Sequence, residues 1–137
     1  PLHLVIVAAQ FGLSTPSVFK QLDAGRASGL YPASGKLVEP TELLEALNSY
    51  DGSEAALASL APLLRNDLQA PALSCAPQLE QTLNLRDSEG VYASLVSGSG
   101  PTVLLLTSSQ ARAEALEASL RASGNHAVSA VSAILYQ

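Results

Sequence analysis

Aromatic residues are scarce in this chain of 137 residues, which has four tyrosines, two phenylalanines and no tryptophan. Packing volume must therefore come from aliphatic side chains, as in an alanine-rich core of mixed helix and sheet. Hydrophobic residues still make up 47% of the sequence and charged residues only 14%. This composition predicts a globular chain that is more apolar than a free-standing soluble domain needs, so we expect part of its surface to belong to an interface.

Positive charge is also in short supply. The seven Lys and Arg residues are scattered singly, and the formal net charge is -5. No basic stripe is available to neutralise a phosphate backbone, so we expect no nucleic-acid partner.

Long apolar runs and paired cysteines are missing as well. The longest apolar run, residues 2–9, is too short to cross a bilayer, and no charged segment of a signal peptide precedes it. We therefore predict a cytoplasmic protein with no membrane partner. The single cysteine, Cys75, excludes an intramolecular disulfide and has no neighbour at metal-ligand spacing, so no metal site is predicted and the thiol is expected to be a small buried hydrophobe. Because Pro1 leads directly into the apolar run, we interpret the chain as a fragment of a longer protein.

The hydrophobic pattern predicts one α+β domain over residues 1–137. The run at 2–9 is typical of a strand buried on both faces. Ser14 and Pro16 mark the start of a helix to about residue 24, with Val18, Leu22 and the adjacent Phe19 on its apolar side. A loop is predicted over 25–40.

The rest of the chain predicts a helical middle section followed by strands. Residues 41–86 form short helices cut by prolines, the last of them capped by Ser74. Strands are predicted at 91–96 and 102–107, a helix capped by Ser108 or Ser109 follows to 121, and a last strand covers 127–135. With the middle helices as an enlarged first crossover, this order predicts the ferredoxin-like split βαβ arrangement with an antiparallel sheet.

A glycine-containing segment between the two central strands is the most informative local feature. It consists of Ser97, Gly98, Ser99, Gly100 and Pro101. Its glycines permit positive φ and close backbone approach, so consecutive N–H groups can converge on a phosphate. The alternative from spacing alone is a plain turn between two strands. A Rossmann or Walker loop is excluded because a strand follows and no Lys-Ser or Lys-Thr pair is present.

Two other places carry candidate site residues. The helix start at Ser14 and Thr15 presents N–H groups that suit an anion, or is an ordinary cap, and Phe19 either packs in the core or stacks on a heterocycle. Asn66 and Asp67 form a polar pair that accepts a ligand hydrogen bond or holds a neighbouring loop, or that simply caps a helix or is solvated. No nucleophile and base can be assembled, so no catalytic residue is assigned.

Three segments, in this order and spacing, resemble the C-terminal half of the GHMP kinases. They are residues 12–19 (GLSTPSVF), 66–70 (NDLQA) and 97–102 (SGSGPT). The helix start with Phe19 resembles more narrowly the members that use ATP to phosphorylate the 2-hydroxyl of a CDP-linked methylerythritol in the non-mevalonate isoprenoid pathway. Gln69 stands where an acid is common in this family.

The resemblance implies a role for each matching residue. Phe19 is similar to the aromatic that stacks on the cytosine, and Thr15 to a neighbour of the substrate. Residues Ser97, Gly98, Ser99 and Gly100 match the third glycine motif, beside the phosphates, and Asn66 and Asp67 match a pair assigned to the site wall.

The resemblance also implies what this chain lacks. The ATP loop and the Asp and Lys of the family lie in an N-terminal domain that is absent from this sequence. ATP and magnesium are therefore cofactors of the parent enzyme, and this chain alone is expected to be inactive. Its expected partners are that missing domain and the cytidine diphosphate substrate, with self-association through the bare interdomain face. The alternatives are a stand-alone ferredoxin-like ligand-binding or regulatory module, or the C-terminal domain of another GHMP kinase.

Overall fold

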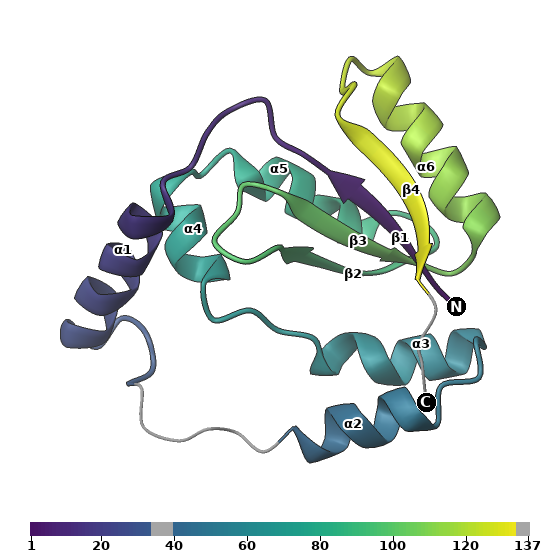
Figure 1. Cartoon of the computed structure of the whole chain (residues 1–137), viewed down its shortest axis with the longest axis horizontal. Helices are drawn as coiled ribbons and strands as arrows, with labels where there is room; N and C mark the ends of the chain where they lie inside the picture. The colour runs from purple at the N-terminus through teal and green to yellow at the C-terminus, as the bar shows by residue number, and fades with distance from the viewer. Residues whose placement is uncertain (34–39, 134–137) are drawn as a thin grey trace.

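A four-stranded antiparallel sheet forms the centre of the molecule in the computed structural model, which describes residues 1–33 and 40–133 (Figure 1). The strands are β1 (Leu2–Val7), β2 (Val91–Val96), β3 (Val103–Thr107) and β4 (Val128–Ala133). The helices are α1 (Thr15–Ala27), α2 (Thr41–Asn48), α3 (Glu54–Leu60), α4 (Gln69–Cys75), α5 (Leu79–Leu83) and α6 (Gln110–Ala122), with 3-10 turns η1 (Ala61–Leu63) and η2 (Asn84–Asp87).

The strand order is β2-β3-β1-β4, and each neighbouring pair is antiparallel. The two strands of the first crossover, β1 and β2, are separated by β3, and β4 returns to the other side of β1. This is the order of the ferredoxin-like fold, so the predicted fold class is confirmed. The long first crossover contains α1 to α5, which puts α1 and the end of β2 within reach of each other.

One face of the sheet carries the main hydrophobic core. Val5 and Val7 of β1 point to this face, where α4, α5 and α6 cover the sheet. The members of this core cluster are almost all aliphatic, as the shortage of aromatics predicts: Val5, Val7, Val18, Ala72, Ala76, Leu79, Leu83, Val91, Val96, Val103, Leu105, Ala113, Leu116 and Val128.

The opposite face is only partly covered, which corrects the prediction of a strand buried on both faces. Leu4 and Ile6 alternate with the core residues of β1 and remain half-buried. Leu57 and Leu60 of α3 are fully buried outside the main cluster, so α3 has its own smaller apolar contact. The apolar surplus of the composition therefore lies in part on this face.

The outer edge of β4 is covered by side chains of α6. Glu117 accepts the N–H of Ala130 at 2.9 Å, and its other oxygen accepts Arg121 Nε at 2.9 Å. Arg121 also donates to the carbonyls of His126 and Val128. An edge strand presents unpaired backbone groups that can pair with another chain, and these two side chains occupy two such groups of β4, at Val128 and Ala130, and a third just before the strand, at His126.

Several local predictions were wrong. Ser74 does not cap α5, because it lies inside α4 and its hydroxyl contacts Tyr31. Cys75 is exposed, since it ends that short helix and points out of the core. Helix α1 continues to Ala27, beyond the predicted start of the loop at 25. Residues 34–39 of that loop, and 134–135 of the predicted last strand, lie outside the described residues. Within the described ranges, no helix is both long and apolar enough to cross a membrane.

Candidate functional site

The start of α1 and the glycine loop of residues 97–100 meet through two hydroxyl groups. Thr15 Oγ1 lies 2.7 Å from Ser99 Oγ. Helix α1 begins here because Ser14, in an extended conformation, accepts the N–H of Ser17 at 3.4 Å and Pro16 occupies the first turn. This contact joins two of the three places that the sequence singles out, and the third, at Asn66, is joined to the same loop by a hydrogen bond to Gly98 O.

Phe19 lies one helical turn beyond Thr15, and residues four apart share one face of a helix. Its side chain is 49% exposed, whereas its neighbours Val18 and Leu22 are buried. The core-packing reading of Phe19 is therefore wrong. An aromatic ring is left available on the helix face that also carries the contact to the glycine loop.

The glycine loop is a tight turn in which half of the expected N–H groups are already used. Gly100 N–H donates to Ser97 O at 2.9 Å, and Ser97 N–H donates to Thr102 O at 2.8 Å. The N–H groups of Gly98 and Ser99 have no partner among the described residues. The loop can therefore offer an anion two adjacent N–H groups, together with the hydroxyls of Ser99 and Thr15.

Gly100 is required at its position by both conformation and packing. Its φ is +81°, in the left-handed region, and a Cβ there would lie 3.1 Å from Val96 Cγ1 and 3.3 Å from Leu13 Cδ2. Gly98 has φ +57° but nothing within 4 Å of a Cβ. Gly100 lets the loop pack against the segment before α1, whereas Gly98 leaves open space in front of the backbone.

Asn66 holds this loop and does not face open solvent as a wall residue would. Its Nδ2 donates to the carbonyls of Val96 and Gly98, both at 2.7 Å, and its Oδ1 accepts the N–H of Leu68 at 3.0 Å. The loop-holding alternative of the sequence is the one that the contacts support. Asp67 is exposed beside it.

Gln69 is a site residue whose contact the sequence did not reveal. Its Oε1 accepts the N–H of Val96 at 3.0 Å. The sequence showed only that Gln69 replaces an acid, and an oxygen acceptor is what an acid at this position would also provide. The only signal was the proximity of Gln69 to Asn66, which lies three residues earlier in the turn that precedes α4.

Helix α1 is held in place from its other end by Tyr31. The Tyr31 ring packs on Gly25, where an added Cβ would lie 2.1 Å from the ring, and its hydroxyl bonds Ser74 of α4 at 2.9 Å. Helix α1 lies at the side of the molecule and packs on α4 (Figure 1). The contact with Tyr31 therefore helps to fix where Thr15 and Phe19 stand relative to the loop.

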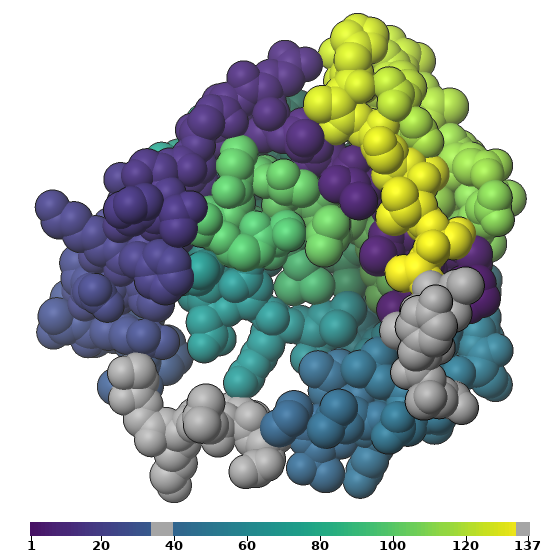
Figure 2. All heavy atoms as spheres, in the orientation of Figure 1, coloured from purple at the N-terminus to yellow at the C-terminus, as the bar shows by residue number. Residues whose placement is uncertain are grey.

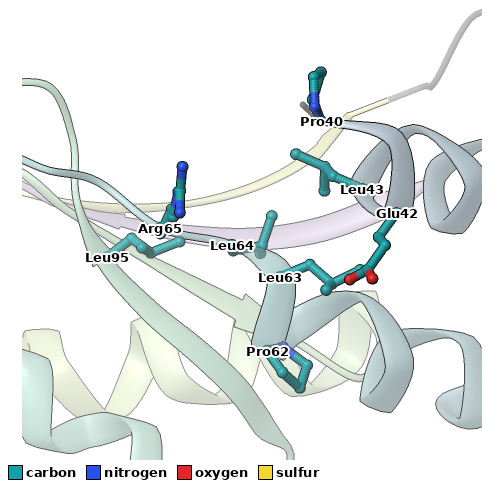
Figure 3. Close-up of a pocket in the computed structure, with 8 residues that line it drawn as sticks. All are labelled: Pro40, Glu42, Leu43, Pro62, Leu63, Leu64, Arg65 and Leu95. Carbon is teal, nitrogen blue, oxygen red and sulfur yellow. The ribbon is translucent and has the colours of Figure 1, made fainter. Parts of the chain in front are cut away.

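In the space-filling view the β2–β3 hairpin, in green, is recessed between α1 on the left and β4 on the right (Figure 2). A separate pocket of about 450 Å³ lies between α2, η1 and β2, with walls of mostly aliphatic residues and two charged ones, Glu42 and Arg65 (Figure 3). None of the predicted site residues lines that second pocket.

In residues 1–33 and 40–133, no group of three or more His, Cys, Asp and Glu is arranged to hold a metal ion. Asp51 lies in the turn between α2 and α3, where hydrogen bonds from Ser53 lower the pKa of its carboxyl group. The chemistry that the site offers is recognition by hydroxyl and N–H donors and by one aromatic face.

A ferredoxin-like α+β domain with a glycine loop against a helix start defines the class of this protein. The family described as GHMP kinases C terminal matches residues 41–126, and the chain belongs to this family. The 4-diphosphocytidyl-2-C-methyl-D-erythritol kinase of Nocardia farcinica is 46% identical over 122 residues, and that of Rhodococcus jostii is 43% identical over 122 residues. Each alignment covers 89% of this chain and 37% of the relative.

A solved structure has the same fold. The crystal structure of 4-(cytidine 5'-diphospho)-2C-methyl-D-erythritol kinase superposes with a TM-score of 0.69 at 22% identity, over 95% of this chain and 42% of that one. The chain thus spans well under half the length of the relatives it matches. It corresponds to their C-terminal part, as the name of the matching family states.

Proposed function

We propose that this chain is the C-terminal, substrate-side domain of a kinase that uses ATP to phosphorylate the 2-hydroxyl of 4-diphosphocytidyl-2-C-methyl-D-erythritol in the non-mevalonate isoprenoid pathway. The observation that carries the proposal is the 2.7 Å contact between Thr15 and Ser99. This contact supports the proposal because it joins the helix that carries the exposed ring of Phe19 to a glycine loop with free N–H groups. The names of the relatives supply the substrate.

Each part of the site fits one part of such a substrate. Phe19 presents an exposed ring on which a cytosine can stack. Thr15, one turn back along α1, is a hydroxyl donor for the polar part of the ligand. The N–H groups of Gly98 and Ser99 suit a phosphate oxygen, because N–H groups in a turn with positive φ concentrate partial positive charge.

The reactive groups belong, in this proposal, to an N-terminal domain outside the present sequence. ATP and magnesium bind there, together with the base that accepts the proton of the hydroxyl group. Phosphoryl transfer depends on positioning and on stabilisation of charge, so this chain alone should have no turnover. The proposal also places the enzyme in the cytoplasm. The length of the relatives supports the missing domain, since the chain spans 37% of them.

Turnover with two substrates tests the proposal. The full-length protein should convert ATP to ADP with 4-diphosphocytidyl-2-C-methyl-D-erythritol, and the 137-residue chain should not. Homoserine and mevalonate serve as alternative alcohols, since a different GHMP kinase would prefer one of them. Robust turnover by the chain alone, or no phosphorylation of the cytidine substrate by the full-length protein, would contradict the assignment.

A further inference from the structure

We propose that Asn66 is a positioning residue: with Gln69 it holds the start of the glycine loop, and by itself it sets the direction of the free N–H group of Ser99. This inference rests on the proposed function, because the N–H groups matter for catalysis only if the loop lies beside phosphates. Asn66 acts through the backbone of the loop and does not bind the substrate itself.

The end of β2 explains why the loop needs hydrogen bonds from side chains. We call the bonds that Asn66 and Gln69 make to Val96 and Gly98 the clamp. Strand β2 stands at the edge of the sheet, and among the described residues β3 is the one strand that pairs with it. The two hydrogen-bonding groups of Val96 face outward from the sheet, where Gln69 accepts the N–H at 3.0 Å and Asn66 donates to the carbonyl at 2.7 Å. Two side chains from the start of α4 therefore replace the missing strand at the point where the loop begins.

The second bond of Asn66 fixes the orientation of the next peptide. Asn66 Nδ2 donates to Gly98 O at 2.7 Å. In a trans peptide the carbonyl and the following N–H point in opposite directions. Since the Gly98 carbonyl points at Asn66, the N–H of Ser99 is held pointing away from it.

The neighbouring peptide is fixed in the same way by the turn itself. Ser97 O accepts the N–H of Gly100 at 2.9 Å, so the N–H of Gly98 points away from Gly100. The free N–H groups of Gly98 and Ser99 are thus oriented by two different acceptors. Only the N–H of Ser99 depends on a side chain, because Asn66 donates to the carbonyl of the same peptide.

The hydrogen bonds of Asn66 argue against direct contact with a ligand. Its amide donates twice and accepts once within the protein. A ligand that took the side chain would have to break the bonds to the loop. Asp67, exposed next to it, makes none of these contacts and is the natural control.

Asn66→Asp distinguishes the two hydrogen bonds that Asn66 donates to the loop from the one that it accepts from Leu68 in its own turn. The aspartate keeps an oxygen to accept the N–H of Leu68, but it has no amide to donate to the carbonyls of Val96 and Gly98. In ¹⁵N-labelled chain, the amide resonances of residues 97–100 should shift while that of Leu68 stays in place. Asp67→Asn should leave the loop resonances unchanged, and retained spectral dispersion will show that each variant is folded.

Gln69 supplies a matched pair of variants. Gln69→Glu keeps an oxygen acceptor for the N–H of Val96 and should preserve the loop resonances, whereas Gln69→Leu removes the acceptor and should shift them. In the full-length kinase, Asn66→Asp should lower kcat about 10-fold to 100-fold, with the KM for the cytidine substrate changed less than about twofold.

Two results would overturn the proposal: loop resonances that do not move in Asn66→Asp, or an unchanged kcat in that variant when the resonances do move. Failure of the proposed function looks different, because the unmutated full-length protein would then show no turnover of the cytidine substrate. The resonance experiment on the chain does not depend on that outcome.

Discussion

The hydroxyls of Thr15 and Ser99 lie 2.7 Å apart, although 84 positions separate them in the chain. This bond joins the helix that carries Phe19 to the glycine loop. Thr15→Val and Ser99→Ala each remove one hydroxyl, and the double variant should cost less than the sum of the two. We expect a coupling of about 0.5–1 kcal/mol, the lower part of the range for a hydrogen bond, because both groups are partly solvated.

Urea unfolding of the unmutated chain, the two single variants and the double variant measures this coupling. Ser17→Ala, on the same turn of α1, is the control, since no side-chain hydrogen bond to Ser99 is involved. Strict additivity of Thr15→Val and Ser99→Ala would show that the two hydroxyls do not stabilise each other in solution.

The two loop glycines should respond differently to an added methyl group. Both have positive φ, so alanine is strained at either position by about 1 kcal/mol. Gly98 has open space around it, whereas a Cβ at Gly100 would crowd Val96 and Leu13. Thermal or urea unfolding should therefore show Gly100→Ala to be less stable than Gly98→Ala by about 1–2 kcal/mol. Equal losses of unfolding free energy in the two variants would mean that Val96 and Leu13 can move to accommodate the added methyl group at no cost.

Phe19→Ala should weaken binding of the cytidine substrate in the full-length kinase. A stacking contact is worth about 1–3 kcal/mol, so the KM for that substrate should rise about 10-fold while the KM for ATP stays the same. Phe19→Tyr keeps the ring face and should bind normally. Leu44→Ala is a control of similar exposure on α2, at 52%. Equal rises in both KM values for Phe19→Ala would contradict the stacking role.

The order of elements and the fold class could be predicted because they follow from local patterns. Alternating or continuous aliphatic runs marked all four strands, and Ser14, Ser53 and Ser109 cap helices where hydroxyl residues precede apolar periodicity. Ser74 shows the limit of such signals. A serine shortly before a proline, as Ser74 is before Pro77, is typical of a helix cap. In the structure Ser74 instead lies inside α4, where its hydroxyl forms a hydrogen bond with the hydroxyl of Tyr31.

The sequence predicted which segments form the candidate site, but it did not predict the contacts between them. The glycine loop and the helix start were visible as motifs, yet the bonds from Asn66 and Gln69 to Val96 cross 30 and 27 positions. The periodic spacing of hydrophobic residues within one helix or strand does not predict contacts between residues so far apart in the chain. The exposure of Phe19 was likewise undecided, because its place next to the Val18 and Leu22 stripe suits either the core or the surface.

Glu117 should make the stability of the chain depend on pH. The N–H of Ala130 and then the side chain of Arg121 stabilise the carboxylate, and together they lower the pKa of Glu117 below its ordinary value. A carboxyl group with a lowered pKa in the folded state stabilises the fold above its unfolded pKa, about 4.3. This stabilisation disappears as the pH falls through the folded pKa. Glu117→Gln should thus be less stable than the unmutated chain near neutral pH, with the difference shrinking in acid.

Urea unfolding at several values between about pH 7 and about pH 3 measures this difference. Arg121→Gln provides the internal comparison. It removes the cation but leaves the N–H of Ala130, the larger cause of the shift, so part of the pH dependence should survive. It should also lower stability across the range, because Arg121 donates to the carbonyls of His126 and Val128. If the difference between Glu117→Gln and the unmutated chain stays constant in acid, the carboxylate does not hold the β4 edge, and the contact with Ala130 contributes no pH-dependent stability.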